Sequence, residues 1–125
     1  MTENEISFAI RGAVFTVYNH LGPGLLESVY ENVLKHELTL IGLTVENQIP
    51  LPVYYKEVKL DLGFRIDLLV NGTVIIEIKS VEHLAEVHHK QLLSYLKLSN
   101  KKLGLLINFN TTEIDKNIFR KVNKL

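Results

Sequence analysis

The sequence of 125 residues contains no cysteine and no tryptophan. Without cysteine, a disulfide scaffold, thiolate zinc sites and cysteine nucleophiles are excluded. No apolar run approaches the roughly 18 residues that a membrane-spanning helix needs. The first residues, Met1 to Glu5, include no basic side chain and lead into no long apolar stretch, so they do not resemble a signal peptide. We therefore expect a cytoplasmic protein without a membrane segment.

A net charge is also missing, because 14 basic side chains balance 14 acidic ones. Their distribution is uneven: residues 1–62 carry four basic and eight acidic side chains, whereas residues 63–125 carry ten and six. The basic excess of the second half could attract a polyanion, or it could be an ordinary solvated surface. Charge alone leaves both alternatives open.

What the sequence does contain is enough apolar material for a core. Hydrophobic residues make up 46% of the chain, and only three residues are proline. A chain of this size can bury about two thirds of the surface that its unfolded form exposes. The composition excludes disorder as the main state, and we expect one domain over residues 1–125.

Hydrophobic periodicity predicts two helices in the first third of the chain. Apolar residues recur at helical spacing over about Asn4 to His20 and again over about Leu26 to Leu40. Gly22-Pro23-Gly24 separates the two helices. Thr2 and Glu5 have the spacing of a capping box for the first one.

The middle of the chain changes to a β-type pattern. Residues 43–55 are rich in β-branched and aromatic side chains, but Pro50 and Pro52 make part of this stretch an edge strand or a bulge. A short strand is predicted at 59–62. Two further strands, 64–70 and 73–79, follow it.

The Asn71-Gly72 dipeptide predicts that these last two strands form a hairpin. A type I′ turn needs positive φ at both central residues, which this dipeptide favours. In a two-residue turn, Val70 faces Thr73 and Asp67 faces Ile76. The expected register therefore places Glu77 diagonal or adjacent to Asp67.

The last third predicts a helix over 84–99, a fully buried strand over 102–109 and a short strand over 118–125. The predicted order is α-α-β-β-β-α-β. This order indicates an α/β (α+β) fold with a central mixed sheet flanked by helices.

Three charged residues interrupt the apolar hairpin strands. Asp67 lies among Phe, Ile, Leu and Val residues, and Glu77 and Lys79 share one face of the next strand because side chains alternate with period two. Two carboxylates this close repel unless a proton or a cation separates them. The sequence leaves two explanations open: a site for a hard divalent cation, or a salt bridge of Lys79 with Asp67 or Glu77.

Two helical segments carry further polar side chains at matching spacing. Gln91 and Tyr95 lie at i and i+4, on one face of the predicted third helix. Glu27, Tyr30 and Glu31 are similarly spaced on the second helix. Glu27 would also be favoured by the helix dipole alone, because it lies in the first turn.

Taken together, these residues resemble a known family. Asp67, then Glu77-Ile78-Lys79, then Gln91 with Tyr95, is similar to the D…ExK…QxxxY signature of RecB-like PD-(D/E)XK nucleases. Gly24-Leu25-Leu26-Glu27-Ser28-Val29-Tyr30 is a literal G-x-x-E-x-x-Y and resembles the GxxExxY proteins of the same superfamily. The resemblance extends to Gly104–Phe109 and implies a restriction-endonuclease-like core.

The resemblance also implies roles for individual residues. Asp67, Glu77, the backbone carbonyl of Ile78 and Glu27 would hold Mg²⁺ or Mn²⁺, and Lys79 would position or deprotonate the attacking water. Gln91 and Tyr95 would shape the site and contact the backbone phosphate, while Tyr30 is expected to pack. The expected contacts with the nucleic acid are Arg65, His88, Lys90 and Lys97.

Several alternatives stay open at this point. Arg65 could instead form an ion pair with a nearby carboxylate. His20, His36, His83 and His89 are interpreted as surface or structural residues, since no zinc-binding spacing is present. The predicted function is a metal-dependent nuclease acting on DNA more readily than RNA. The alternative is a catalytically weak or inactive binding module or complex subunit, and either could work as a homodimer or in a larger complex.

Overall fold

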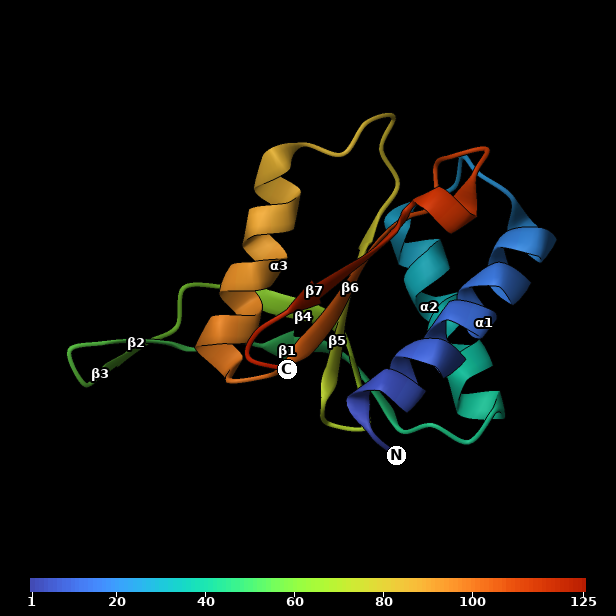
Figure 1. Cartoon of the computed structure of the whole chain (residues 1–125). Coiled ribbons are helices and arrows are strands. Elements are labelled where there is room, and N and C mark those ends of the chain that lie inside the picture. The colour runs from blue at the N-terminus through green and yellow to red at the C-terminus, as the bar shows by residue number, and fades with distance from the viewer.

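The computed structural model describes residues 1–125 as a five-stranded mixed sheet covered by helices on both faces (Figure 1). The strand order is β1-β4-β5-β6-β7, and only the β5–β6 pair is parallel. The fold class predicted from the sequence, α+β with a central mixed sheet, is confirmed. The elements are α1 (Glu3–Leu21), α2 (Glu27–Leu40), β1 (Val45–Pro50), β2 (Val53–Tyr55), β3 (Val58–Leu60), β4 (Arg65–Val70), β5 (Val74–Lys79), α3 (Glu86–Ser99), β6 (Leu103–Asn108), the 3₁₀ helix η1 (Ile114–Lys116) and β7 (Ile118–Val122).

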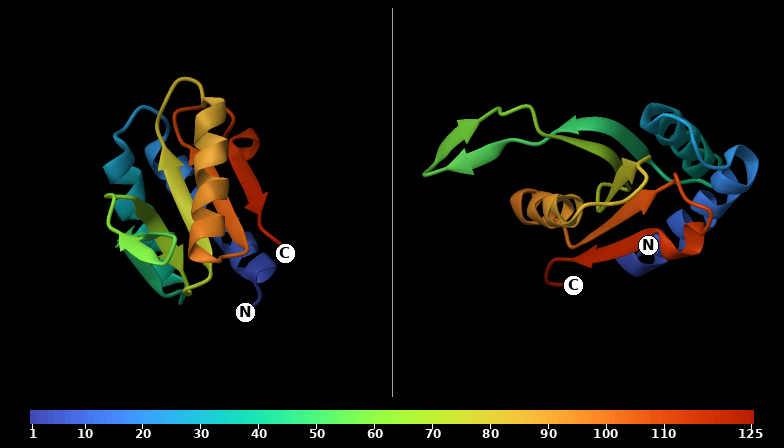
Figure 2. Two further views of the ribbon diagram at one scale, coloured as in Figure 1. Left: turned by 90° about the vertical axis from the view of Figure 1, so that its left-hand side faces the viewer. Right: turned by 90° about the horizontal axis from the view of Figure 1, so that it is seen from above.

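The number of strands exceeds the prediction, because the stretch around Pro50 and Pro52 is not one strand. β1 ends at Pro50 on the main sheet, and β2 pairs with β3 in a separate two-stranded sheet. This β2–β3 hairpin projects away from the body of the molecule (Figure 2). Proline cannot donate to a ladder, which explains why pairing changes partner there.

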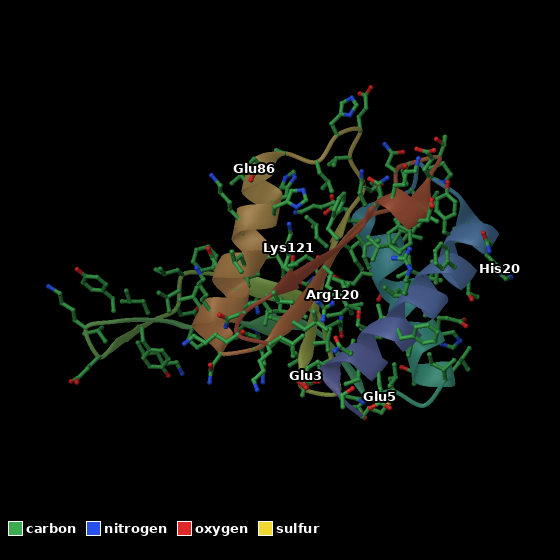
Figure 3. The ribbon with its side chains drawn as sticks, viewed as in Figure 1. Glu3, Glu5, His20, Glu86, Arg120 and Lys121 are labelled. Carbon is green, nitrogen blue, oxygen red and sulfur yellow. The ribbon has the colours of Figure 1, made fainter.

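The predicted capping box of α1 is confirmed. The Thr2 hydroxyl accepts from the Glu5 N–H, and the Glu5 carboxylate accepts from the Thr2 N–H. Glu3 and Glu5 lie in this first turn, close to Arg120 of β7 (Figure 3). The Arg120 guanidinium donates to Oδ1 of Asn4, which ties the start of α1 to the edge of the sheet.

The sheet separates two apolar clusters, one on each of its faces. The larger, of 19 residues, lies under α1 and α2, and the smaller, of seven, lies under α3. α3 packs so closely on β6 that a Cβ added at Gly104 would meet Leu92 at 2.9 Å. No helix is both long and apolar enough to cross a membrane.

The predicted type I′ turn is present, but the predicted register is wrong by one residue. Asn71 and Gly72 have φ values of 51° and 66°. Val70 nevertheless pairs with Val74, so Thr73 is an extra residue in the loop. Asp67 therefore does not face Ile76, which pairs with Leu68. Continued by one residue, the register places Asp67 opposite Glu77.

The strand β4 also changes face at Asp67. Leu68 belongs to the cluster under α1 and α2, whereas Ile66, two residues earlier, belongs to the cluster under α3. Regular alternation along β4 would place Arg65 on the same face as Asp67, but the alternation does not hold across this point. On the neighbouring strand, Gln48 has a φ of 52°, and Gln48 with the opposite Asp67 is the one pair missing from the β1–β4 ladder.

Candidate active site

Beyond the Leu68–Ile76 pair, the β4–β5 ladder stops and two carboxylates take its place. The Asp67 N–H donates to Oε1 of Glu77 at 3.1 Å, and the Ile78 N–H donates to Oδ2 of Asp67 at 2.8 Å. Each carboxylate thus accepts a backbone N–H of the opposite strand that would otherwise lack a partner. The two strands remain connected here through side chains instead of backbone pairs.

Burial and mutual repulsion act on both carboxylates. Glu77 is only 5% exposed, and its burial, followed by the charge of Asp67, raises the pKa of Glu77 to about 9. Burial also raises the pKa of Asp67, against the effect of the hydrogen bond from Ile78. At neutral pH, the pair therefore retains a proton in the absence of a cation.

Lys79 provides no direct partner for either carboxylate. Its positive charge lowers both pKa values, but less than burial raises them. The single salt bridge of the chain is Lys116–Glu113, at an exposed position far along the sequence. The alternative of a structural salt bridge between Lys79 and Asp67 or Glu77 is therefore wrong.

On the side of α2, Asp67 borders a cleft of about 300 Å³. The cleft brings Asp67 together with the predicted ligands Glu27 and Ile78. Glu77 and Lys79 do not line it, because side chains alternate along β5 and theirs point to the opposite face from that of Ile78. The lining residues are Glu27, Ser28, Glu31, Gln48, Asp67 and Ile78.

Three residues of this cleft, Ser28, Glu31 and Gln48, were not predicted as site residues. Nε2 of Gln48 donates to Oε1 of Glu31 at 2.6 Å and lies 3.4 Å from Oδ1 of Asp67. Burial, with a contribution from the charge of Asp67, raises the pKa of Glu31. Glu31 follows Glu27 by one helical turn, a signal that the sequence did contain. No sequence pattern marks Gln48, because its contacts depend on its left-handed backbone.

The N-terminus of α2 is fixed by Tyr30. Its buried ring stacks on Phe109 with centroids 4.3 Å apart, and its hydroxyl donates to the carbonyl of Gly22 at 2.6 Å. The prediction that Tyr30 packs is confirmed. Glu27, one turn earlier, accepts the Ser80 N–H at 3.3 Å, so this exposed carboxylate is held beside the end of β5.

On the side of α3, Gln91 and Tyr95 share a face as predicted. Nε2 of Gln91 donates to the Tyr95 hydroxyl at 3.1 Å. Burial first, then the charges of Glu77 and Asp67, raise the pKa of Tyr95. This hydroxyl therefore stays protonated near the carboxylate pair. Phe64 packs against the Tyr95 ring and closes this side.

The four residues predicted to contact nucleic acid are more scattered. Arg65, Lys90 and Lys97 are exposed, and none of them forms an ion pair, so the ion-pair alternative for Arg65 is wrong. Nδ1 of His88 accepts the Ala85 N–H at 3.1 Å. His88 thus caps the first turn of α3.

A scan against protein-family models matches residues 4–121 to the PD-(D/E)XK nuclease superfamily. The chain belongs to this superfamily. Searches of curated proteins and of solved structures gave no match. Membership of the superfamily indicates nuclease activity and a nucleic acid as substrate, and divalent metals are in general use among PD-(D/E)XK nucleases.

The donor atoms of this nuclease-superfamily site fit a hard divalent cation, because they are carboxylate and carbonyl oxygens. As the side chains stand, however, no three His, Asp or Glu residues lie close enough together to hold one ion. Asp67 and Glu77 are in contact, while Glu27 and Glu31 border the cleft of Asp67 and are hydrogen-bonded to other residues. A third carboxylate would therefore have to move to complete a coordination shell.

Proposed function

We propose that the chain is a metal-dependent nuclease that hydrolyses phosphodiester bonds, with Asp67 and Glu77 as the central ligands of Mg²⁺ or Mn²⁺. The observation that carries this proposal is the carboxylate pair in the β4–β5 gap. Glu77 is buried and Asp67 is half-buried, both have raised pKa values, and neither has a cationic side chain bonded to it. Such a pair costs stability, and a divalent cation would relieve that cost.

The carbonyl of Ile78 is the third ligand of the proposed set. The N–H and C=O of one strand residue point to the same neighbouring strand. Since the Ile78 N–H faces Asp67 across the gap, the Ile78 carbonyl faces the gap too. Glu27 is the proposed fourth ligand, and Glu31 is the other carboxylate able to enter from α2.

The remaining polar groups suit phosphodiester hydrolysis. A bound divalent cation would neutralise phosphate charge and lower the pKa of a bound water. Lys79, free of ion pairs and half-buried at the end of β5, would orient that water and stabilise charge developing on the phosphate. Gln91 and the protonated Tyr95 hydroxyl would donate to the phosphate oxygens.

Contacts beyond the cleft are proposed for Arg65, His88, Lys90 and Lys97. Lys90 and Lys97 are exposed on α3, about two helical turns apart, and would contact successive phosphates. Each phosphate contact that a lysine makes adds about one to the slope of log affinity against log salt. The Lys90→Ala/Lys97→Ala double variant should therefore lower this slope by about two.

The finer assignments rest on the sequence. The Gly24-x-x-Glu27-x-x-Tyr30 motif supports membership of the GxxExxY group within the superfamily. We assign residues 1–125 to one nuclease-like domain, acting in the cytoplasm on DNA in preference to RNA. We also propose a second copy of the chain or a larger complex as its working form.

The test is cleavage of single- and double-stranded DNA and RNA with Mg²⁺, Mn²⁺ or EDTA. Wild-type protein should cleave slowly with either metal and not in EDTA. Lys79→Ala should lower the rate on the order of 10²–10⁴-fold, the usual contribution of a positioned acid–base group. Lys124→Ala, an exposed change near the C-terminus, serves as the matched control.

The possible outcomes are distinct. Cleavage that is equal in wild type and Lys79→Ala would mean a contaminating nuclease. Salt-sensitive binding of nucleic acid without cleavage by wild type would replace the enzyme with a binding module of nuclease fold.

A further inference from the structure

A polar cavity of about 430 Å³ lies beside the candidate active site and not in it. Three connections meet around it at one end of the sheet: the α1–α2 turn, the loop after β5 and the loop between β6 and η1 (Figure 1). The parallel strands β5 and β6 both reach this end by their carboxyl termini. In open α/β sheets, ligands bind at this position.

The cavity is held open by a buried amide. Asn108, the last residue of β6, is 2% exposed. Its Oδ1 accepts the N–H groups of Val81 and Asn110 at 3.0 and 3.3 Å, and its Nδ2 donates to the Val81 carbonyl at 2.9 Å. These bonds join the loop after β5 to the loop after β6. The cavity therefore exists before any ligand enters.

Other polar groups of the lining have no partner within the protein. The side chains of Asn110 and Thr112 make no intramolecular hydrogen bond, and neither do those of the exposed Glu82 and His83. They offer an amide, a hydroxyl, a carboxylate and an aromatic ring to a ligand. Apart from Pro23, all the lining side chains are polar.

The charge of the lining excludes a phosphate as the main occupant. No lysine or arginine lines the cavity, and Glu82 would repel an anion. Amide and hydroxyl groups match the edge of a nucleobase and the hydroxyls of a sugar, and a histidine ring can stack on a base. The volume lies within the usual range for sites that hold small organic molecules.

The cavity is close to the candidate metal ligands. Ser80 follows β5 directly, and it bonds both to Glu27 through its N–H and to the carbonyl of Leu25 through its hydroxyl. Pro23 and Glu82, which line the cavity, lie two residues beyond these contact points. Two residues of extended chain span at most about 7 Å. One nucleic acid strand could therefore occupy both places.

We propose that this cavity holds the base and sugar of a nucleotide adjacent to the bond that is cleaved, so that the substrate is a single strand or a frayed end. The inference rests on the proposed nuclease function. A base that enters a pocket cannot remain paired, and extracting one from a duplex costs its pairing and stacking energy. A paired strand would therefore fit the cavity poorly.

Binding of a short fluorescein-labelled single-stranded DNA, the same RNA and the matching duplex in EDTA tests this proposal. Wild type should prefer a single strand to the duplex. The Asn110→Ala/Thr112→Ala variant should weaken single-strand binding about tenfold without changing its salt dependence, because it removes uncharged hydrogen bonds. Where cleavage is measurable, KM should rise more than kcat falls.

Two further variants test whether a loss of binding comes from the polar groups of the cavity. Asn110→Leu removes the amide at similar volume and should show most of the loss, while circular dichroism confirms that it folds. Asn19→Ala/Thr39→Ala makes the same residue changes on the exposed sides of α1 and α2 and should bind like wild type.

Failure of the cavity proposal differs from failure of the proposed function. Unchanged binding by the Asn110 and Thr112 variants, equal binding of duplex and single strand, or absence of single-strand binding by wild type would each overturn the cavity proposal. If the variants lose single-strand binding but wild type cleaves nothing with metal, the cavity proposal stands and the nuclease proposal falls.

Discussion

The two halves of β5 contrast sharply. From Val74 to Ile76, the strand is bonded to β4 on one side and to β6 on the other, and all its side chains are buried and apolar. From Glu77 to Lys79, the ladder to β6 continues, but carboxylates replace the ladder to β4. Apolar packing thus fixes the strand in one half, and this allows the other half to hold charged groups that cost stability.

The interruption of regular strand pairing extends across three strands at one level of the sheet. Gln48 on β1, Asp67 on β4 and Glu77 on β5 all lie where regular pairing is interrupted. Between this level and the Asn71-Gly72 turn, β4 forms regular pairs with both β1 and β5. The sheet therefore has one part that is built for stability and another part that is arranged around oxygen ligands.

The largest expected effect is on cation binding. Asp67→Asn should abolish binding of Mn²⁺ in a calorimetric titration, because it removes one of the two central carboxylates. The variant should fold with equal or slightly higher stability, since the Asn carbonyl can still accept the Ile78 N–H and the repulsion with Glu77 is gone. Asp115→Asn, an exposed change on η1, is the control.

Unfolding of Asp67→Asn under conditions where wild type folds would contradict this expectation. It would show that the carboxylate holds β4 and β5 together. The half of β5 from Glu77 to Lys79 would then be structural, like the half from Val74 to Ile76.

A substitution in the apolar half of β5 should have the opposite effect: it should lower stability and leave cation binding unchanged. Ile76→Ala should lower the free energy of unfolding by about 2–5 kcal/mol, because it leaves a cavity in the cluster under α1 and α2. Urea denaturation measures this loss. Below the transition, Mn²⁺ binding should be unchanged, and a weakened affinity in the folded variant would show that the two halves are coupled.

The next effect is a pH dependence of stability without metal. The pKa of Glu77 is about 9 in the folded state against an ordinary 4.5, so the folded chain binds more protons than the unfolded chain between these values. The contribution of Glu77 to stability should therefore be complete near and below pH 4.5 and decline as pH rises towards 9. Its size should be on the order of a few kcal/mol.

Glu77→Gln isolates this contribution, because an amide resembles the protonated carboxyl and does not titrate. Denaturation in EDTA across this pH range should give a flatter profile for Glu77→Gln and a greater stability than wild type at pH 9. Parallel profiles for the two proteins would mean that Glu77 is ionised in the folded state.

The sequence predicted the elements better than it predicted the geometry of the site. The helices, the Asn71-Gly72 turn and the buried strand β6 follow from local patterns of glycine, apolar spacing and capping residues. The extra Thr73 in the loop does not, because a turn of either length fits the same dipeptide. That one residue shifts Asp67 from Ile76 to the level of Glu77 and so brings the two carboxylates together.

The cleft on the side of α2 depends still more on tertiary structure. Glu27 and Glu31 have helical spacing, so their common face could be predicted. Gln48 lies in a strand whose pattern gives no sign of a positive φ. Its side chain contacts Glu31 and Asp67, which come from distant parts of the chain.

The smallest expected effect concerns the backbone at Gln48. A residue with a side chain pays roughly 1–2 kcal/mol for the left-handed region, whereas glycine enters it freely. Gln48→Ala and Gln48→Gly both remove the bond to Glu31, so they differ chiefly in this strain. After the greater unfolded-state entropy of glycine is subtracted, Gln48→Gly should be the more stable by at most about 1 kcal/mol.

The same pair of changes at Asn47 supplies the control, because Asn47 has no positive φ and lies in regular pairing with Leu68. There the alanine variant should be more stable than the glycine variant, so the order of the two should reverse between neighbouring positions. Urea denaturation of the four proteins measures both differences. Should alanine be the more stable at both positions, Gln48 would be unstrained, and the irregular level of the sheet would begin at Asp67 instead of at β1.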